Sequence, residues 1–220
     1  LSRMSHEIRT PMNAIIGMTQ IAKNSLDNPA QVSNCLDKMD ISAQYLLSLI
    51  NDILDMSRIE SGKMVIANNE FDFSGFVEEI RTLIIPQAAN KGLEFDIVTE
   101  NISSSMYIGD ATRIKQVIIN LLSNSLKFTK RGGKITLTIC EKSIAEENKA
   151  MIKFIVTDTG IGMSKDFIEK MYRPFEQESA SNVEKEHGTG LGLAIAKEIA
   201  IEHGGDIQIK STLGVGTSVT

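Results

Sequence analysis

The sequence has few of the features that mark disulfide-rich, metal-thiolate or membrane-spanning proteins. Its 220 residues include only two cysteines, Cys35 and Cys140. They lie far apart without metal-type spacing, and each lies in an apolar-periodic segment, so we expect reduced thiols in a cytosolic protein. No apolar run reaches the ~18 residues of a membrane span, and the first residues do not resemble a signal peptide.

Dense clusters of positive charge are also absent. The formal net charge is -5, and lysine and arginine are spread along the sequence. Proteins that bind nucleic acid neutralise phosphates with grouped basic side chains. We therefore expect no nucleic-acid partner. The length allows one large domain or two small ones, with enough apolar residues for a core.

Glycines are present in blocks, but not in the pattern of a P-loop enzyme, because no Gly-Lys-Ser or Gly-Lys-Thr occurs. A dinucleotide-binding fold is excluded as well, since no acidic residue follows on a second parallel strand. The two glycine blocks are residues 158–163 (DTGIGM) and 188–193 (GTGLGL). The role of each glycine block depends on the residues that flank it.

The first 60 or so residues predict a helical hairpin, with a polar turn over residues 24–29. Heptad spacing occurs in Met4, Ile8, Pro11, Ile15, Met18 and Ala22, and again in Val32, Leu36, Met39, Ala43, Leu46, Ile50 and Ile53, where Leu47 and Leu54 widen the stripe. A two-helix hairpin leaves apolar surface in water, so we expect pairing with a second copy into a four-helix bundle. Gly62 suits a C-terminal helix cap, and the domain boundary should follow it.

The outer face of the first predicted helix carries His6 and Thr10. With Met4 at heptad position d, these residues fall at f and c, away from the apolar seam. Imidazole is a neutral nucleophile near pH 7, and one ring nitrogen becomes more reactive when the other donates to a carboxylate. Glu7 is placed next to His6 for this purpose. The alternative is a solvated helix face, with Thr10 preparing a kink at Pro11.

From about Val65 the periodicity alternates between helix and strand. The predicted helices are 73–89, 110–129, 165–171 and a last one from the second glycine block to about His203; the predicted strands are 93–99, 134–141, 151–157 and two that begin at Asp206 and Val215. This pattern predicts an α+β domain with helices over one face of a mixed sheet.

One face of the predicted helix 110–129 carries Asn120, Asn124 and Lys127, at positions i, i+4 and i+7. Amide oxygens suit a hard cation that keeps several waters, and lysine suits phosphate. The alternative is an ordinary polar outer face of an amphipathic helix.

Asp158 follows a predicted strand and precedes Gly160 and Gly162. A carboxylate at the edge of a sheet can accept a hydrogen bond from an exocyclic amine, and glycines permit close approach to a ring. An Asp-Thr-Gly turn is the alternative. Residues 188–193 open a helix and would offer free N–H groups to phosphates, so the polar segment before them is expected to form a mobile lid.

In this order and spacing, the His6 block, the asparagine block at 120–128 and the two glycine blocks resemble the transmitter core of sensor histidine kinases of two-component systems. The resemblance covers residues 2–219. It implies an all-α helical hairpin that forms a dimeric four-helix bundle (1–64, dimerisation and phosphoacceptor domain), followed by an α+β Bergerat-type ATP-binding sandwich (65–220).

The same resemblance implies autophosphorylation of His6 by ATP and transfer to an aspartate of a response-regulator receiver domain. It also implies phosphatase activity toward that regulator. The implied catalytic residues are His6, Glu7 and Thr10. The implied ATP site comprises Asn120, Asn124, Lys127, Phe128, Asp158, Gly160, Gly162, Gly188, Thr189, Gly190, Leu191, Gly192 and Thr217, with Asn124 and Asn120 also holding Mg²⁺.

Two competing functions differ in class. The wider ATPase superfamily hydrolyses ATP with a glutamate where this sequence has Asn120, and an amide cannot serve as that base. A catalytically silent dimeric scaffold is the second competitor. We expect a homodimer without membrane contact by this fragment, on the cytoplasmic side, within a full-length protein attached to the inner face of the cell membrane.

Overall fold

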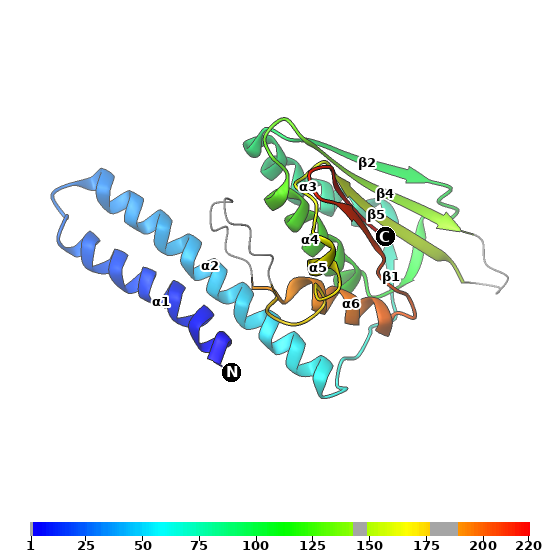
Figure 1. The fold of residues 1–220 in the computed structure, drawn as a ribbon, viewed down its shortest axis with the longest axis horizontal. Coiled ribbons are helices and arrows are strands. Elements are labelled where there is room, and N and C mark those ends of the chain that lie inside the picture. The colour runs from blue at the N-terminus through cyan, green and yellow to red at the C-terminus, as the bar shows by residue number, and fades with distance from the viewer. Residues whose placement is uncertain (1, 143–148, 177–188) are drawn as a thin grey trace. The chain divides into compact units, whose positions relative to one another are not determined.

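The computed structural model describes residues 2–142, 149–176 and 189–220. The chain divides into two compact units, Leu1–Met64 and Val65–Thr220, which are described separately (Figure 1). Within the described ranges, no helix combines the length and the apolar character that crossing a membrane requires.

The first unit is a hairpin of two antiparallel helices, α1 (Ser2–Lys23) and α2 (Pro29–Glu60) (Figure 1). The predicted hairpin is therefore confirmed. The side chain of Asn28 caps α2 by accepting a hydrogen bond from the Gln31 N–H, and a proline at the first helical position suits this start. After the last residue of α2, Gly62 has a φ of 61°, a left-handed conformation that glycine adopts without strain.

Each helix of the hairpin buries one apolar stripe and leaves another exposed. Pro11 and Ala22 are buried on α1, and Cys35 and Leu49 are buried on α2. Further apolar side chains of the hairpin are exposed to solvent: Met12, Ile16, Leu36, Leu47, Ile50 and Leu54. The predicted α2 seam is thus divided, because Leu36 and Ile50 belong to the exposed stripe while their neighbours in sequence are buried.

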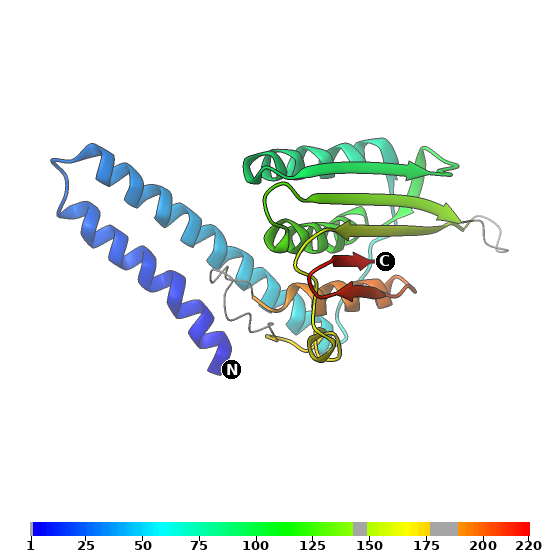
Figure 2. The same cartoon turned by 45° about the horizontal axis from the view of Figure 1, so that its top comes forward.

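The second unit contains a five-stranded mixed sheet in the order β2-β4-β5-β7-β6 (Figure 2). Its strands are β2 (Glu94–Glu100), β4 (Lys134–Lys142), β5 (Met151–Asp158), β6 (Ile209–Thr212) and β7 (Gly216–Val219). Only the β2–β4 pair is parallel, and the other neighbours are antiparallel. Its helices are α3 (Phe73–Lys91), α4 (Ala111–Phe128), α5 (Lys165–Ile168) and α6 (Gly192–Glu202).

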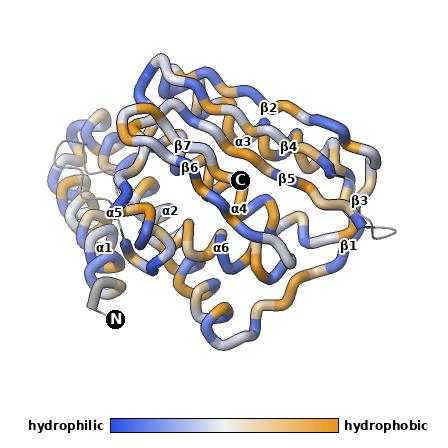
Figure 3. The backbone as a smooth tube through the Cα atoms, turned by 45° about the vertical axis from the view of Figure 1, so that its right-hand side comes forward, coloured by the Kyte–Doolittle hydropathy of each residue, from blue (hydrophilic) through white to orange (hydrophobic). Residues whose placement is uncertain are grey.

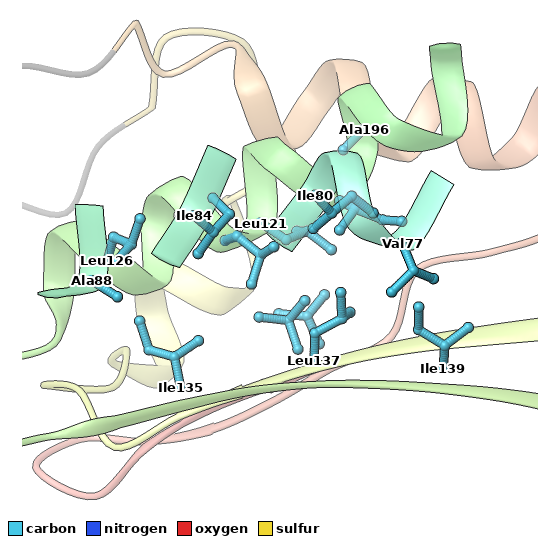
Figure 4. Close-up of a cluster of buried hydrophobic side chains, with 14 of the residues drawn as sticks. Val77, Ile80, Ile84, Ala88, Leu121, Leu126, Ile135, Leu137, Ile139 and Ala196 are labelled. Carbon is cyan, nitrogen blue, oxygen red and sulfur yellow. The ribbon is translucent and has the colours of Figure 1, made fainter. Parts of the chain in front are cut away.

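The core of this unit lies between the sheet and the helices α3 and α4, which cover one face (Figure 4). Along β4, every second residue is fully buried, namely Ile135, Leu137 and Ile139. They meet Ile80 and Ile84 of α3. Figure 3 shows hydrophobic and hydrophilic residues alternating along these elements, as expected where each has one buried face.

Two elements differ from the sequence prediction. A separate pair of short antiparallel strands, β1 (Asn69–Asp72) and β3 (Met106–Gly109), was not predicted. The predicted helix 165–171 is reduced to α5, because Lys170 and Arg173 donate their N–H groups three residues back, as in 3₁₀ turns, rather than four.

Candidate functional site

In the second unit, the centre of the candidate nucleotide site is Asp158, the last residue of β5. Its side chain is 8% exposed and accepts three hydrogen bonds. Oδ2 accepts from the Ser125 hydroxyl at 2.8 Å, and Oδ1 accepts from the N–H groups of Gly160 at 2.9 Å and Thr217 at 3.3 Å. The two bonds to Oδ1 use both of its lone pairs, whereas Oδ2 keeps one lone pair for a further donor.

The structure thus brings three predicted site residues, Asp158, Gly160 and Thr217, into direct contact. The loop after β5 is possible only with glycine, since a Cβ on Gly160 would lie 2.7 Å from the Phe128 carbonyl oxygen. A Cβ on Gly162, whose φ is 67°, would collide with the Thr212 backbone. These contacts hold the loop against the end of α4 at Gly160 and against the end of β6 at Gly162, and they leave no room for a side chain at either position.

Asn120, Asn124 and Lys127 all lie on α4, at a spacing that puts them on one side of the helix. Asn124 is exposed, and the other two are partly buried. Asn120 donates its amide N–H to the Gly192 carbonyl at 3.2 Å, which ties α4 to the start of α6. Its amide oxygen therefore faces away from that bond and stays available as an acceptor.

The C-terminal end of α4 is held by Lys91, a residue that the sequence did not single out. Its ammonium group donates to the Leu126 and Lys127 carbonyls, each at 2.8 Å. A cation at this position also stabilises the negative end of the helix dipole. The predicted site residue Phe128 follows directly. It is 39% exposed, and the Lys127 ammonium lies 4.9 Å from the centre of its ring.

The second glycine block forms the start of α6. Among the described residues no side chain caps this end, so the N–H groups of the first turn are left for another acceptor. The Leu191 side chain is fully buried, so this predicted residue can contribute to a ligand only through its backbone. Thr189 accepts a hydrogen bond from the Leu191 N–H. The predicted lid, with Gly188, lies outside the described residues.

The backbones on both sides of that segment are joined. The Phe175 N–H donates to the Gly190 carbonyl at 2.9 Å, and both residues have left-handed φ values, 65° and 67°. A Cβ on Gly190 would lie 2.8 Å from the Phe175 Cα. A backbone contact therefore ties Phe175 to the second glycine block.

In the first unit, His6 and Thr10 are both exposed on α1, as the heptad assignment predicts. The Thr10 hydroxyl donates to the His6 carbonyl oxygen at 3.1 Å. Glu7 is partly buried, and its Oε2 accepts a hydrogen bond at 3.3 Å from Tyr45 on α2. Burial, together with the charge and hydrogen bond of Glu7, raises the pKa of Tyr45 to about 12, and Asp52 adds to this effect.

Sequence reasoning missed Ser125 and Tyr45. The sequence gives a weak indication of Ser125, because this hydroxyl-bearing residue lies on the buried face of a strongly amphipathic helix. No pattern in the sequence joins Tyr45 to Glu7, since the two residues are 38 positions apart. Among the described residues, no group of three or more His, Cys, Asp or Glu side chains could hold a metal ion. A cation at this site would therefore depend on amide oxygens and on the ligand itself.

Comparison with known proteins assigns families to both units. Residues 109–220 match the family model described as "Histidine kinase-, DNA gyrase B-, and HSP90-like ATPase", and residues 1–62 match the "His Kinase A (phospho-acceptor) domain". The autoinducer 2 sensor kinase/phosphatase LuxQ of Vibrio harveyi is 38% identical over 99% of this chain. The signal transduction histidine-protein kinase BarA of Escherichia coli K12 is 35% identical over 99%. The chain spans about a quarter of the length of these curated relatives, 25% and 23%.

Solved structures support the same fold. The histidine kinase AdeS of Acinetobacter baumannii has a TM-score of 0.67 at 21% identity, covering 97% of this chain and 95% of that one. ThkA in complex with the response regulator TrrA has a TM-score of 0.68 at 24% identity, covering 99% and 58%. Full-length ShkA in complex with AMPPNP has a TM-score of 0.70 at 27% identity, covering 99% and 44%. The predicted fold class, a helical hairpin followed by an ATPase-type sandwich, is confirmed.

Proposed function

Because this chain belongs to the family of histidine kinases, we propose that it phosphorylates His6 with ATP and passes the phosphoryl group to an aspartate of a response-regulator receiver domain. The observation that carries this proposal is that His6 lies exposed on the segment matching the phosphoacceptor model, while the same chain supplies the ATPase-type unit. We assign residues 1–64 to dimerisation and phosphate acceptance and 65–220 to ATP binding.

In the proposed nucleotide complex, the remaining lone pair on Asp158 Oδ2 accepts a hydrogen bond from the adenine amino group. The N–H groups of Gly160 and Thr217 hold the other carboxylate oxygen, and the absence of side chains at Gly160 and Gly162 lets this loop pack against Phe128 and Thr212. Phe128 offers an exposed aromatic face next to it. The N–H groups in the uncapped first turn of α6 and the Lys127 ammonium would bind the negatively charged phosphates.

The side chains on the same face of α4 fit a magnesium ion. Asn124 is exposed, and Asn120 keeps its amide oxygen as an acceptor, so both present the hard oxygen ligands that Mg²⁺ prefers. When bound, the ion would neutralise charge on the triphosphate. This chain's own contribution is to orient the two amides and the Lys127 ammonium toward one region.

At the acceptor, one imidazole nitrogen of His6 attacks the terminal phosphorus. A P–N bond forms, the P–O bond to the β-phosphate oxygen breaks, and ADP leaves with that electron pair. The proton on the other ring nitrogen moves toward the Glu7 carboxylate, which limits the positive charge on the ring. In the proposed phosphatase reaction, the exposed Thr10 hydroxyl, which donates its own proton to the His6 carbonyl, accepts a hydrogen bond from a water molecule beside the phosphoaspartate of a bound regulator. The water oxygen forms a new bond to phosphorus, the P–O bond to the aspartate breaks, and inorganic phosphate leaves.

The exposed apolar stripe of the hairpin supports a homodimer. Leu36, Leu47 and Leu54 are each more than half exposed on α2, at 56%, 60% and 52%. Burying this stripe against a second copy would form a four-helix bundle and remove apolar surface from water. The polar face with His6 and Thr10 would remain accessible to a receiver domain. ATP is present in the cytoplasm, and we propose that this segment acts there.

The experiment is incubation with radiolabelled ATP and magnesium, followed by acid and alkali treatment. A phosphoramidate on histidine is lost in acid and survives base. His6→Gln should abolish the label without changing ATP affinity measured by calorimetry. Label that persists on His6→Gln would place the acceptor elsewhere and refute the assignment. Release of inorganic phosphate without protein label would instead favour simple ATP hydrolysis.

A further inference from the structure

A hydroxyl group on α2 contacts the residue next to the phosphoacceptor. The Tyr45 hydroxyl donates to Oε2 of Glu7 at 3.3 Å, across the two helices of the hairpin. Both side chains are partly buried, whereas His6 is exposed. Within the described residues, no hydrogen bond joins the Glu7 carboxylate to the His6 ring, and the Oε1 atom of Glu7 has no hydrogen-bond partner.

Adjacent residues on a helix point about 100° apart, so Glu7 and His6 do not face each other by default. A glutamate side chain also has three rotatable torsions and can occupy many positions on a helix surface. A second contact that restricts the Glu7 carboxylate would therefore favour its interaction with the neighbouring His6 ring. Tyr45 supplies that contact from a partly buried position on the other helix.

We propose that Tyr45 is a positioning residue for phosphorylation of His6: by holding Oε2 of Glu7, it leaves Oε1 as the oxygen that accepts the imidazole proton. This inference rests on the proposed function of His6 and Glu7. Tyr45 does not touch the reacting atoms and acts only through Glu7.

The electrostatic surroundings keep the tyrosine in its donating form. The pKa of Tyr45 is raised to about 12, first by burial, then by the charge and hydrogen bond of Glu7, and then by the charge of Asp52. The hydroxyl therefore keeps its proton at every pH at which the kinase would be assayed. Deprotonation of Tyr45 therefore does not remove its bond to Glu7 at these pH values.

A purely structural tie between the helices is the competing explanation, and the hairpin contains a matched control. The Thr19 hydroxyl on α1 donates to the Ile15 carbonyl at 2.8 Å and also lies 3.1 Å from the Met39 sulfur on α2. This contact also crosses between the two helices, but it involves neither His6 nor Glu7. Thr19→Val removes its hydroxyl with little change in volume, just as Tyr45→Phe removes only a hydroxyl and keeps the ring.

The test compares initial rates of His6 labelling at several ATP concentrations in the whole chain. Loss of label in His6→Gln is established first in the same assay, so a failure of the proposed function is recognised separately. Tyr45→Phe should then lower the rate constant at saturating ATP roughly three- to tenfold, the effect of one lost hydrogen bond, with an unchanged KM for ATP. Thr19→Val should label at the parent rate.

The second measurement is a double-mutant cycle with Glu7→Gln. If the tyrosine acts through the carboxylate, Tyr45→Phe should cause no further loss once the carboxylate is gone. Three results would overturn the proposal: parent rates in Tyr45→Phe, an equal loss in Thr19→Val, or additive losses in the double variant. A Glu7→Gln protein that labels as fast as the parent would overturn it as well.

Discussion

Replacing Asp158 with asparagine tests the nucleotide site with the smallest change in shape. The amide oxygen of the introduced side chain could still accept from the N–H groups of Gly160 and Thr217, which now bind Oδ1. The Ser125 hydroxyl, which now donates to Oδ2, can rotate and accept from the new amide N–H. We therefore expect Asp158→Asn to fold normally, with an unfolding midpoint in urea close to that of the parent.

The nucleotide should respond differently. The lone pair on Oδ2 that would accept from the adenine amino group is replaced by an N–H, so two donors would face each other. Loss of a hydrogen bond to a charged acceptor costs about 1.5–3 kcal/mol. At ~1.4 kcal/mol for each factor of ten, ATP affinity should fall about ten- to hundredfold.

Titration calorimetry with Mg-ATP and Mg-GTP measures both affinity and selectivity. The parent should prefer ATP, and Asp158→Asn should lose most of that preference, since the keto oxygen of guanine can accept from the new amide. Ser125→Ala is the control, because it removes one hydrogen bond from the carboxylate but leaves its acceptor oxygen in place. If Asp158→Asn bound ATP as tightly and selectively as the parent, the adenine amino group would not be read by this residue.

Three further changes test other parts of the proposal. Asn124→Ala should weaken magnesium-dependent ATP binding by removing a cation ligand, whereas Ser123→Ala on the exposed surface beside it should not. Equal ATP affinities for the parent and both variants would place the ion elsewhere. Thr10→Ala should slow dephosphorylation of the regulator much more than it slows histidine labelling. The dephosphorylation rate is measured with ADP present and without kinase input, and equal rates for the variant and the parent would leave Thr10 with a structural role only. Gly162→Ala should lower the free energy of unfolding by more than the roughly 1–2 kcal/mol expected for a left-handed alanine, because its Cβ collides with backbone. Gly204→Ala, at a position with a similar φ and open space around it, should lose only that amount. Equal losses in denaturant titrations of the two variants would show that the collision is relieved.

The elements predicted well from sequence are those whose apolar pattern repeats many times. The hairpin and the helix α4 repeat their apolar residues over many turns, and each has a capping residue at its start, Asn28 and Asp110. Although β6 and β7 are equally short and were predicted, the four-residue strands β1 and β3 leave little alternating pattern to recognise. These strands depend on tertiary packing instead, including Phe71 against Tyr107, whose ring centres are 6.2 Å apart.

The divided seam of α2 has a similar cause. A strict heptad pattern assigns one apolar stripe, but α2 has apolar residues at neighbouring positions such as Leu49 and Ile50. In the structure, Leu49 is fully buried and Ile50 is 41% exposed. A helix that packs against two partners needs two adjacent stripes, and a sequence period alone does not say which stripe meets which partner.

The candidate site shows the same limit at the level of single side chains. The motifs identified Asp158 and Thr217 because acidic and glycine-rich blocks stand out in sequence, and the strand pairing of β5 with β7 brings these two residues together. Ser125 and Tyr45 supply hydrogen bonds to the acidic residues of the two units, yet both lie within helices whose patterns are dominated by apolar residues. A buried hydroxyl is costly unless it is bonded, so its partner must be a polar group that the fold brings within reach. Such partners are set by the packing of elements distant in sequence, which is why the acidic residues could be predicted and the hydroxyls that orient them could not.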